Sequence, residues 1–424
     1  MFKVVAPTKM ITSFLKYIKF DLSEPQTRHL KNFMEALLAC EGTKTIAKLN
    51  QLILAPTDQS AFTDFFTYSP WSNVLFRQQL YAALVSWVLE QNKDTIFPQP
   101  VYISIDDSRS QKPKSSIHFE VTDWHFNTTE SHGYYYGVSF ITVHIACGNR
   151  STPIALRLYL RDKTIRRINR HRSKDKRIPF KSKYKIAKEI LEELAQFIPK
   201  QVAVYVLFDS WYASAKLIKK CRRLRWHVIC ALKCNRKFRK KQAKQSRQLS
   251  QLARYTRNRD FYPIMVKSSD SSVRYWVNTQ HGYLNDIKDE VSIFTSKRHP
   301  KDRSPEFFMT TDLSLSPRCG LSRYTRRWAV EVDHLYLKVR LGLGDFRLRS
   351  YERISRYFDL VCLTLAYLHW RRVEENDSNI KSLSDVIALH RHDQQDKFLR
   401  AFGEQILKHG FVDLAIADWL EKAA

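Results

Sequence analysis

The sequence predicts an α/β fold in which a mixed sheet is interrupted by a β-rich insertion and flanked by helical regions. Three observations predict it. Apolar residues recur every three or four positions near both ends of the chain, which is typical of helices. Short β-branched runs alternate with helical segments in the first half, and strand-like runs with polar turns follow them. These changes of pattern divide the chain into an N-terminal helical domain at 1–95, a first core part at 96–232, a β-rich insertion at 233–306, a second core part at 307–372 and a C-terminal helical region at 373–424.

Composition limits the class of protein and the kind of partner. The chain has 424 residues, of which 44% are hydrophobic, so it can bury a large core and wholesale disorder is excluded. Its 71 Lys and Arg against 42 Asp and Glu give a net charge of +29, which favours a polyanion, above all nucleic acid, as partner. Only 10 residues are Gly, and no Gly-rich phosphate-binding loop is found. The 7 cysteines indicate neither a disulfide framework nor a zinc site with finger-like spacing.

The N-terminal domain is expected to consist of short helices. Apolar residues lie at three- and four-residue spacing over 27–39, 44–54, 59–68 and 71–91, with breaks at Gly42 and at prolines. Short helices with tight turns are compatible with a helix-turn-helix element that binds DNA, although a purely structural bundle has the same pattern. We expect recognition of DNA sequence to lie in this domain.

Acidic residues follow two of the strands expected in the core. The run VYISID leads into Asp106 and Asp107, and VAVYVLF stops at Asp209. Carboxylates at the carboxyl ends of neighbouring strands meet at the edge where α/β sheets build their sites. Their hard oxygens suit divalent ions, although an aspartate at a strand end is also a common turn residue. The pattern therefore predicts a metal site and leaves a structural role open.

A strongly basic stretch lies between two elements of the core. The segment 157–185 holds 13 Lys and Arg against Asp162 and Asp175. Lys and Arg neutralise backbone phosphates and add affinity for DNA without reading its sequence, whereas a solvated face is the usual alternative for a charge run. The candidate phosphate-binding residues of this stretch are Arg166, Arg167, Arg170 and Arg172.

One helix of the second core part combines a polar stripe with an apolar face. The segment 322–340 is expected to be helical, and at 100° per residue four of its polar residues fall on one narrow stripe. The stripe consists of Tyr324, Arg327, Glu331 and Lys338. The apolar face beside it includes Trp328, Val332, Leu335, Tyr336 and Val339. An acid between two cations fits a structural ion-pair ladder as well as a metal ligand flanked by phosphate-binding groups.

The stripe carries a resemblance to a known family. Tyr324-x2-Arg327-x3-Glu331-x6-Lys338 resembles, at every position and spacing, the Y-R-E-K signature of bacterial insertion-sequence transposases with a DDE catalytic triad. The string YTRRWAVE is similar to their YxxRWxIE. IDDS at 105–108 and FDSWYAS at 208–214 are similar to their first and second aspartate motifs, with a hydroxyl residue after the first aspartate. This hydroxyl residue is usually Thr in the family and is Ser here.

The resemblance implies a ribonuclease H-like fold and a DNA-cleaving site with two Mg²⁺ ions, for which Mn²⁺ can substitute. The ions would be held by Asp107, Asp209 and Glu331, and Asp106 stays open as the alternative to its neighbour. One metal would activate water or a DNA 3′-hydroxyl, and the other would stabilise the leaving oxygen of an in-line displacement.

The other residues of the signature have implied roles in binding DNA. Tyr324, Arg327 and Lys338 would contact phosphate near the cleaved bond. Trp276, in a strand of the insertion, is a candidate for stacking on a flipped base, and a core position is the alternative.

The implied activity is transposition by a magnesium-dependent endonuclease that nicks the ends of its element and joins them to target DNA. The expected partners are double-stranded DNA, as transposon ends and as target, and a second copy of the chain in a homodimeric DNA complex. We expect a bacterial, cytoplasmic, nucleoid-associated protein with no membrane partner. Two alternatives stay open: a ribonuclease H-fold nuclease or resolvase without strand transfer, and a domesticated DNA-binding regulator.

Overall fold

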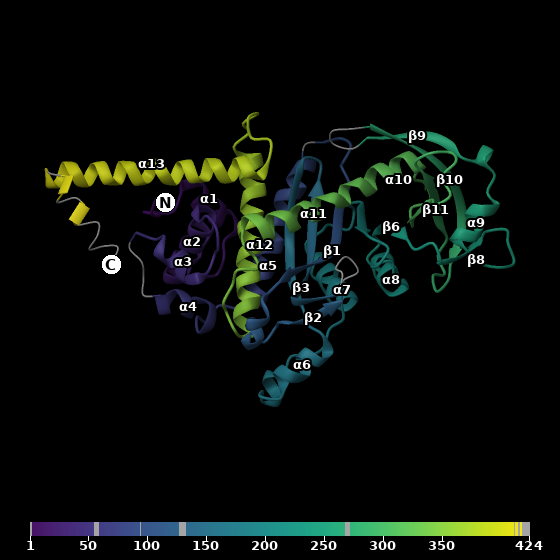
Figure 1. The fold of residues 1–424 in the computed structure, drawn as a ribbon. Coiled ribbons are helices and arrows are strands. Elements are labelled where there is room, and N and C mark those ends of the chain that lie inside the picture. The colour runs from purple at the N-terminus through teal and green to yellow at the C-terminus, as the bar shows by residue number, and fades with distance from the viewer. Residues whose placement is uncertain are drawn as a thin grey trace.

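The computed structural model describes residues 2–54, 59–93, 95–126, 133–267, 272–410, 412–413 and 416–417. In these ranges the strands form one continuous mixed sheet, with a helical body at one end and a strand-rich extension at the other (Figure 1). The predicted α/β class, with flanking helices and a β-rich insertion, is therefore confirmed.

The N-terminal region folds as helices that pack around one hydrophobic core. The four expected helices form, and a further one, α1, precedes them. Side chains of Thr8, Ser23, Thr45 and Ser72 cap four of the helices by accepting backbone N–H groups of the first turn. The helices are α1 (Lys9–Ile18), α2 (Glu24–Ala39), α3 (Ile46–Gln51), α4 (Gln59–Thr67) and α5 (Asn73–Leu89).

The sheet is parallel at its centre and antiparallel elsewhere. Hydrogen-bonded neighbours follow the order β2-β3-β1-β5-β6-β12-β11-β10-β7-β8, with β4 paired to β3 and β9 paired to β10. β1, β5 and β6 run parallel. The strands are β1 (Val101–Gln111), β2 (Asp123–Phe126), β3 (Tyr134–Cys147), β4 (Arg150–Tyr159), β5 (Val204–Phe208), β6 (His227–Leu232), β7 (Lys237–Lys240), β8 (Arg247–Gln248), β9 (Tyr262–Lys267), β10 (Ser272–Leu284), β11 (Val291–Lys297) and β12 (Glu306–Thr310).

The insertion continues the sheet and does not form a separate layer of strands. β12 returns antiparallel to β6, and β11 and β10 extend the sheet from there. The exact domain boundaries remain predictions. The helices between and beside these strands are α6 (Asp162–Asn169), α7 (Lys183–Leu194), α8 (Ala215–Arg223) and α9 (Leu249–Tyr255). Short 3₁₀ helices are η1 (Glu90–Asn92), η2 (Lys114–His118), η3 (Lys174–Lys176), η4 (Asn258–Asp260) and η5 (Thr325–Arg327).

Long helices complete the chain. The helix expected from Ser322 begins earlier, because Ser316 caps it and Pro317 occupies its first turn. The elements are α10 (Pro317–Tyr324), α11 (Trp328–Leu335), the π-helical turn η6 (Tyr336–Arg340), α12 (Tyr351–Glu374) and α13 (Leu383–His409). α12 packs against β4 on one side and against α1, α2, α4 and α5 on the other, so it joins the sheet to the N-terminal helices (Figure 1). None of the described helices has the length and apolar character needed to cross a membrane.

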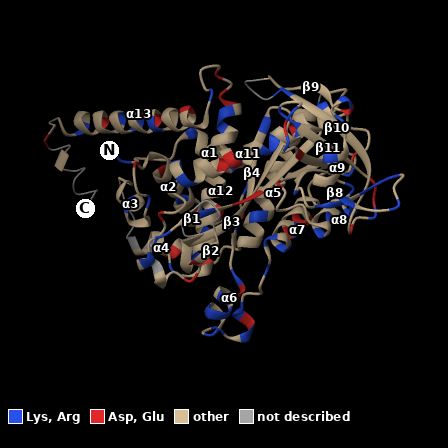
Figure 2. Ribbon diagram, turned by 45° about the vertical axis from the view of Figure 1, so that its right-hand side comes forward, with Lys and Arg blue, Asp and Glu red and all other residues tan. Residues whose placement is uncertain are grey.

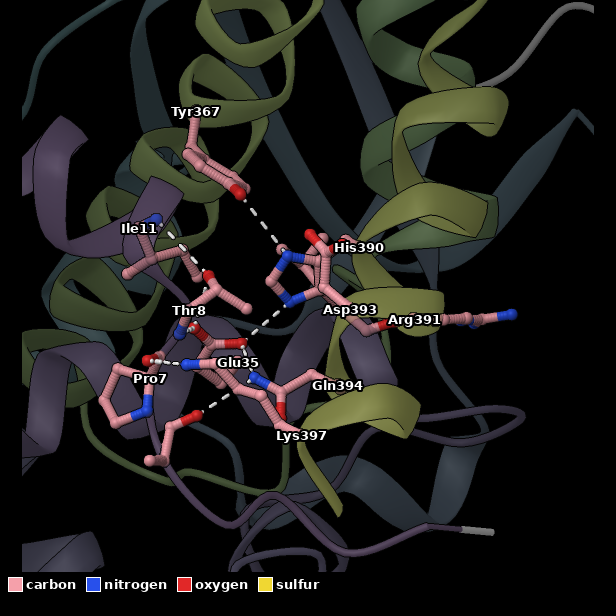
Figure 3. A network of polar contacts seen from close by, with 12 residues as sticks. Pro7, Thr8, Ile11, Glu35, Tyr367, His390, Arg391, Asp393, Gln394 and Lys397 are labelled. Carbon is pink, nitrogen blue, oxygen red and sulfur yellow. Dashed lines mark hydrogen bonds and ion pairs between the residues drawn. The ribbon is translucent and has the colours of Figure 1, made fainter. Parts of the chain in front are cut away.

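A buried polar network fixes α13 to the N-terminal helices (Figure 3). Glu35 of α2 is fully buried and accepts hydrogen bonds from the amide of Thr8 at 2.5 Å and from Nε2 of Gln394 at 2.5 Å. Its other partner is Nε2 of His390, 2.8 Å away. Burial alone would raise the pKa of Glu35, but His390 and Thr8 hold that pKa below its ordinary value. A buried carboxylate needs such partners, and the bonds from His390 and Gln394 are the ones that hold α13 to α2.

Candidate active site

The first aspartates lie inside a strand and not at its end. β1 continues past Asp106 and Asp107 to Gln111, because β3 pairs with it over this whole length. The expectation that the strand ends at these residues is therefore wrong. The parallel partner β5 does end here: Phe208 pairs with Ile105, the last pair between the two strands. Asp106 and Asp209 are the residues that follow this last pair, so the two acids lie side by side on adjacent strands.

The two neighbouring aspartates point to opposite faces of the sheet, since successive side chains of a strand alternate. On one face, Asp106 accepts a hydrogen bond from Nη1 of Arg327 at 3.1 Å. On the other face, Oδ2 of Asp107 lies 2.6 Å from Nζ of Lys183 at the start of α7. The structure therefore places Asp106, and not Asp107, beside the helix of the polar stripe.

The loop after β5 holds Asp209 in place. Its Oδ1 accepts hydrogen bonds from the backbone amides of Trp211 at 2.9 Å and Tyr212 at 3.1 Å. This side-chain-to-backbone turn is the common use of an aspartate at a strand end. It leaves the other carboxylate oxygen of Asp209 available to a ligand.

Arg327 connects the acids of the sheet with the acid of the helix. Its Nη1 donates to Asp106, and its Nη2 donates to Oε1 of Glu331 one turn later. Burial and the negative charge of Asp209 raise the pKa of Asp106 to about 7, although Arg327 opposes the shift. Asp106 and Glu331 thus share a single guanidinium, and Asp209 adds a third negative charge nearby. This concentration of negative charge is typical of a site built for cations.

The remaining stripe residues line the same face. The helix widens into the π-helical turn η6 at Lys338, whose Nζ donates to Oγ of Ser108 at 3.1 Å. π-helical turns inside α-helices are frequent at functional sites. Tyr324 packs edge-on against Phe308 with ring centres 5.0 Å apart, and the guanidinium of Arg327 lies 5.7 Å from the Tyr324 ring. Every residue of the predicted stripe therefore borders the acids or supports a residue that does.

The apolar face predicted beside the stripe is only partly buried: Tyr336 is buried, whereas three other residues of this face are exposed. Trp328, Leu335 and Val339 are 63%, 56% and 64% exposed. The stripe itself lies against the sheet, because ion pairs and hydrogen bonds to Asp106 and Ser108 hold it there.

A buried acid on α11, which sequence reasoning missed, anchors this orientation. Asp333 is completely buried and bonds to Nδ1 of His144 on β3 at 2.6 Å and to Nε2 of His369 on α12 at 3.1 Å. Burial would raise the pKa of Asp333, but the two histidines lower it to about 2. The available signal was two histidines within otherwise apolar segments, which need a buried polar partner.

A cleft of about 700 Å³ opens between the acids and the insertion. Tyr275, Arg298, Tyr324 and Arg327 are among its lining residues, but Trp276 is not. Alternation along β10 explains this: Tyr275 and Val277 pack toward the sheet core, so Trp276 points to the other face. The structure thus brings Tyr275, and not the predicted Trp276, next to the stripe.

Part of the basic stretch serves to hold the chain together. Arg172 is paired with Glu120 at 3.0 Å and also with Glu352, and its side chain is only 14% exposed. Arg167 donates to the carbonyl oxygens of Glu120 at 3.0 Å and Thr122 at 2.9 Å. These arginines tie α6 and the following loop to the sheet.

The other two arginines face solvent. α6 projects from the sheet edge and carries several basic residues (Figure 2). Arg166 is paired within the helix with Asp162 at 2.6 Å, yet its side chain is 77% exposed. Arg170 is exposed as well. Of the four predicted arginines, Arg172 is therefore largely buried, whereas Arg166, Arg167 and Arg170 are exposed.

The acids that could hold metal ions are Asp106, Asp209 and Glu331. The described residues contain no ready cluster of three or more metal-binding side chains, since Arg327 occupies the space between Asp106 and Glu331. Glu331 would come within reach of a shared ion only after Arg327 gives up its bond.

Comparison with known proteins identifies the family. Residues 20–274, more than half of the chain, match the family described as DDE superfamily endonuclease. The match includes both aspartate motifs, and Glu331 lies beyond it. No curated protein matches the chain. The large mixed sheet, the N-terminal helices and the long C-terminal helices are consistent with a ribonuclease H-like DDE fold. The chain belongs to the DDE superfamily endonucleases.

Proposed function

We propose that this endonuclease is the transposase of a bacterial insertion sequence, which cleaves the ends of its element and joins their 3′-hydroxyls to target DNA. Family membership supports DNA cleavage, and the Y-R-E-K stripe supports the finer assignment. One observation carries the proposal: the guanidinium of Arg327 joins Asp106 to Glu331 beside Asp209. The signature and both aspartate motifs thereby belong to one site.

We further propose Asp106 as the first catalytic acid, in place of Asp107. Asp106 shares a face of the sheet with Arg327 and is close enough to Asp209 for that charge to raise its pKa. Asp107 lies on the opposite face and is already paired with Lys183. A metal ion bound to Glu331 would lie on the face of β1 opposite to the Asp107 carboxylate, so Asp107 could not be its ligand.

Asp106, Asp209 and Glu331 fit two divalent ions, Mg²⁺ or Mn²⁺, because all three offer hard oxygen ligands. Burial and the neighbouring charge of Asp209 raise the pKa of Asp106, and a cation bound between the two carboxylates would relieve their repulsion. When bound, the ions would supply activation of water or of a 3′-hydroxyl and stabilisation of the leaving oxygen.

The chain's own cations would position the phosphate. Arg327 offers a planar, two-pronged donor group, and its present carboxylate partners can be exchanged for phosphate oxygens of similar geometry. Lys338 approaches the same face from the next turns of the helix. Its ammonium donates a hydrogen bond to the hydroxyl of Ser108 and so is paired with a neutral group. Tyr324 supports the Arg327 guanidinium with its ring. Together they would hold the scissile phosphate for in-line attack.

The proposed partners are duplex DNA at the element's ends and at the target, with a second copy of the chain in the DNA complex. Arg166 and Arg170 would add phosphate contacts, and the N-terminal helices would read the end sequence. The reaction would take place in the bacterial cytoplasm at the nucleoid.

The test is a reaction of the purified chain with DNA that carries the element's own ends, a target plasmid and Mg²⁺, beside DNA with scrambled ends and a reaction in EDTA. We expect metal-dependent nicks at the terminus and joined products. Cutting without joining would identify a nuclease or resolvase. Specific binding without cutting, equal to that of a Glu331→Gln variant, would identify a DNA-binding regulator.

A further inference from the structure

A basic pocket lies beside α10 and η5, on a different side of these helices from the cleft that contains Arg327. Its volume is about 240 Å³. α10 packs against β9, and η5 lies over β1 and β5, so the pocket opens where these elements meet (Figure 1). We call it the basic pocket, and its polar lining residues include Lys267, Arg318, Cys319, Ser322, Arg323 and Arg326.

The charges that line the basic pocket are all positive. Its four cations come from β9, α10 and η5, and none of its lining residues is Asp or Glu. Among the described residues, none of the four takes part in an ion pair, unlike the neighbouring Arg327. Asp312, the last acid before α10, is bonded to Tyr205 and Ser314 instead. Like charges gathered without a counter-charge attract an anion into the space between them.

Two of the arginines are held in place by buried tyrosines of the sheet. Cζ of Arg323 lies 4.4 Å from the centre of the Tyr205 ring, and Cζ of Arg326 lies 4.7 Å from that of Tyr102. The two tyrosines are paired on β5 and β1, with ring centres 6.0 Å apart. Nη1 of Arg323 is shielded from solvent and has no hydrogen-bond partner among the described residues. A fixed donor without an acceptor is satisfied by a ligand that supplies one.

The ligand that fits the basic pocket is a phosphate of a DNA backbone. Guanidinium groups bind phosphate oxygens through two parallel N–H bonds, and a lysine adds a further positive charge. Lys267, Arg318 and Arg326 are exposed, so the pocket is open to the surface. A phosphate that stays linked to sugars on both sides can therefore enter it. DNA is also the phosphate-bearing substrate of the family to which the chain belongs.

The basic pocket shares its helices with the residues assigned to the scissile phosphate. Arg323 and Arg326 immediately precede Tyr324 and Arg327, which line the cleft. Adjacent residues of a helix point about 100° apart, so the same segment carries cations on two sides. A phosphate in the basic pocket would thus fix the segment that carries Arg327.

We propose that the basic pocket binds a second backbone phosphate of the DNA, distinct from the phosphate that is cleaved, and thereby holds η5 and Arg327 in position. The contrast with the cleaved phosphate rests on the proposed function. Binding of a DNA phosphate in the pocket rests only on the DNA substrate of the family.

The first test counts phosphate contacts. Binding of end DNA by the full-length chain is measured in EDTA over a range of salt concentrations, with Arg323→Gln, Arg326→Gln and the double variant. Each phosphate contact adds about 0.9 to the slope of log affinity against log salt, so the double variant should lose about that much. Each single variant should bind roughly tenfold more weakly at one salt concentration. Arg326→Lys should keep the slope, because it keeps the charge.

A matched control separates the pocket from general loss of positive charge. Arg400 is an arginine with a 75% exposed side chain on α13, away from α10 (Figure 1). Arg400→Gln changes the net charge equally and should keep the slope and the affinity. If Arg323→Gln lowers the melting temperature, the exposed Arg326 carries the comparison. An unchanged slope in Arg326→Gln and the double variant, or an equal loss in Arg400→Gln, would overturn the proposal.

The second test distinguishes DNA from free phosphate. The exposed cysteines are Cys234 and Cys319, so alkylation of a Cys234→Ser chain by iodoacetamide reports on Cys319 in the basic pocket. We expect end DNA in EDTA to slow this alkylation strongly, and less so when Arg323 and Arg326 are both replaced by Gln. Millimolar inorganic phosphate should leave the rate nearly unchanged. Protection by inorganic phosphate but not by DNA would identify a small-anion site and contradict the proposal.

The third test locates the phosphate and separates this inference from the proposed function. End DNA is prepared with one neutral methylphosphonate linkage at a time, and binding in EDTA is followed by nicking with Mg²⁺. We expect one linkage, away from the cut, whose neutralisation weakens the unchanged chain but not the double variant. Such a linkage in a chain that never nicks would remove the transposase and keep the basic pocket. Normal nicking without such a linkage, or with it at the cleaved bond, would remove the second phosphate.

Discussion

The two faces of β1 give the same residue type two different surroundings. On one face, Asp106 has a second acid, Asp209, as neighbour and shares a single guanidinium, that of Arg327, with Glu331. On the other face, Asp107 is paired with the ammonium of Lys183, which also lies 5.1 Å from the centre of the Trp211 ring. The first face has an excess of negative charge, and the second is neutralised by its own partner.

This difference assigns the roles. Asp107 is already neutralised by a cation, so a metal ion would stabilise it little. Asp106 lies beside a second carboxylate, so a metal ion would relieve the repulsion between them. Sequence proximity says nothing about it, because one step along a strand moves a side chain to the other side of the sheet. The following predictions test this comparison, beginning with the largest expected effect.

The largest effect is expected from removing an acid of the first face. Asp106→Asn, Asp209→Asn and Glu331→Gln should each abolish nicking and joining while end DNA is still bound, since each loses a metal ligand but no phosphate contact. Asp107→Asn should nick at a rate close to that of the unchanged chain. Single-turnover nicking with Mg²⁺ and a gel-shift assay measure both properties. A dead Asp107→Asn beside an active Asp106→Asn would reverse our assignment of the two faces.

Replacing Arg327 is expected to lower the nicking rate and, at the same time, to raise the affinity for metal. Removing a preorganised charge contact from a catalytic site lowers the rate on the order of 10²–10³-fold, so Arg327→Ala should nick that much more slowly. The same change frees Asp106 and Glu331, so Mn²⁺ should bind more tightly in the absence of DNA, as measured by titration calorimetry. Arg327→Lys should stay impaired in nicking, because a point charge cannot make the two-pronged contact. Unchanged Mn²⁺ affinity in Arg327→Ala would show that the guanidinium does not compete with metal.

The pH dependence of stability provides a third test of the first face. The pKa of Asp106 is raised from 3.8 to about 7, so the folded state holds its proton more tightly than the unfolded state does. The stabilisation that protonated Asp106 contributes is then fully present below about pH 4 and is lost as pH rises to about 7. Its upper limit is about 4 kcal/mol. In EDTA, Asp106→Asn should lack this loss, so the difference between the two denaturation curves should widen up to pH 7 and then stay constant. Parallel curves over this range would mean that Asp106 does not have the buried, negatively charged surroundings described for this face.

Much of the fold and part of the site could be predicted from the sequence. Alternation of strands and helices gave the α/β class, and the spacing from Tyr324 to Lys338 gave residues that the structure gathers on one face. What failed depended on partners distant in sequence. β1 runs on to Gln111 because β3 pairs with it there, and helical periodicity could not tell that Trp328 would face solvent.

The same reason explains the misplaced aromatic residue and the missed acid. Tyr275 and Trp276 are adjacent on β10, and the pairing of that strand decides which of them enters the cleft. Asp333 lies two residues after Glu331, and its role exists only because His144 and His369 approach it from a strand and a helix elsewhere. Local patterns predict elements well, but the side of an element that becomes functional is decided by tertiary packing.

The smallest effect on cleavage is expected from the second face. Lys183 and Asp107 are 18% and 24% exposed in their side chains, so loss of the ammonium in Lys183→Met leaves a partly buried carboxylate without its partner. Leaving a polar group unsatisfied in this way destabilises a fold by about 1–3 kcal/mol, so we expect a lower melting temperature and a nearly normal nicking rate. Adding Asp107→Asn to Lys183→Met should restore part of the stability, because the unpaired charge is removed together with its partner. The double-mutant cycle, read by denaturation, measures this coupling. Slow nicking by Lys183→Met at unchanged stability would instead place the second face in the reaction, and the distinction between the two aspartates would fail.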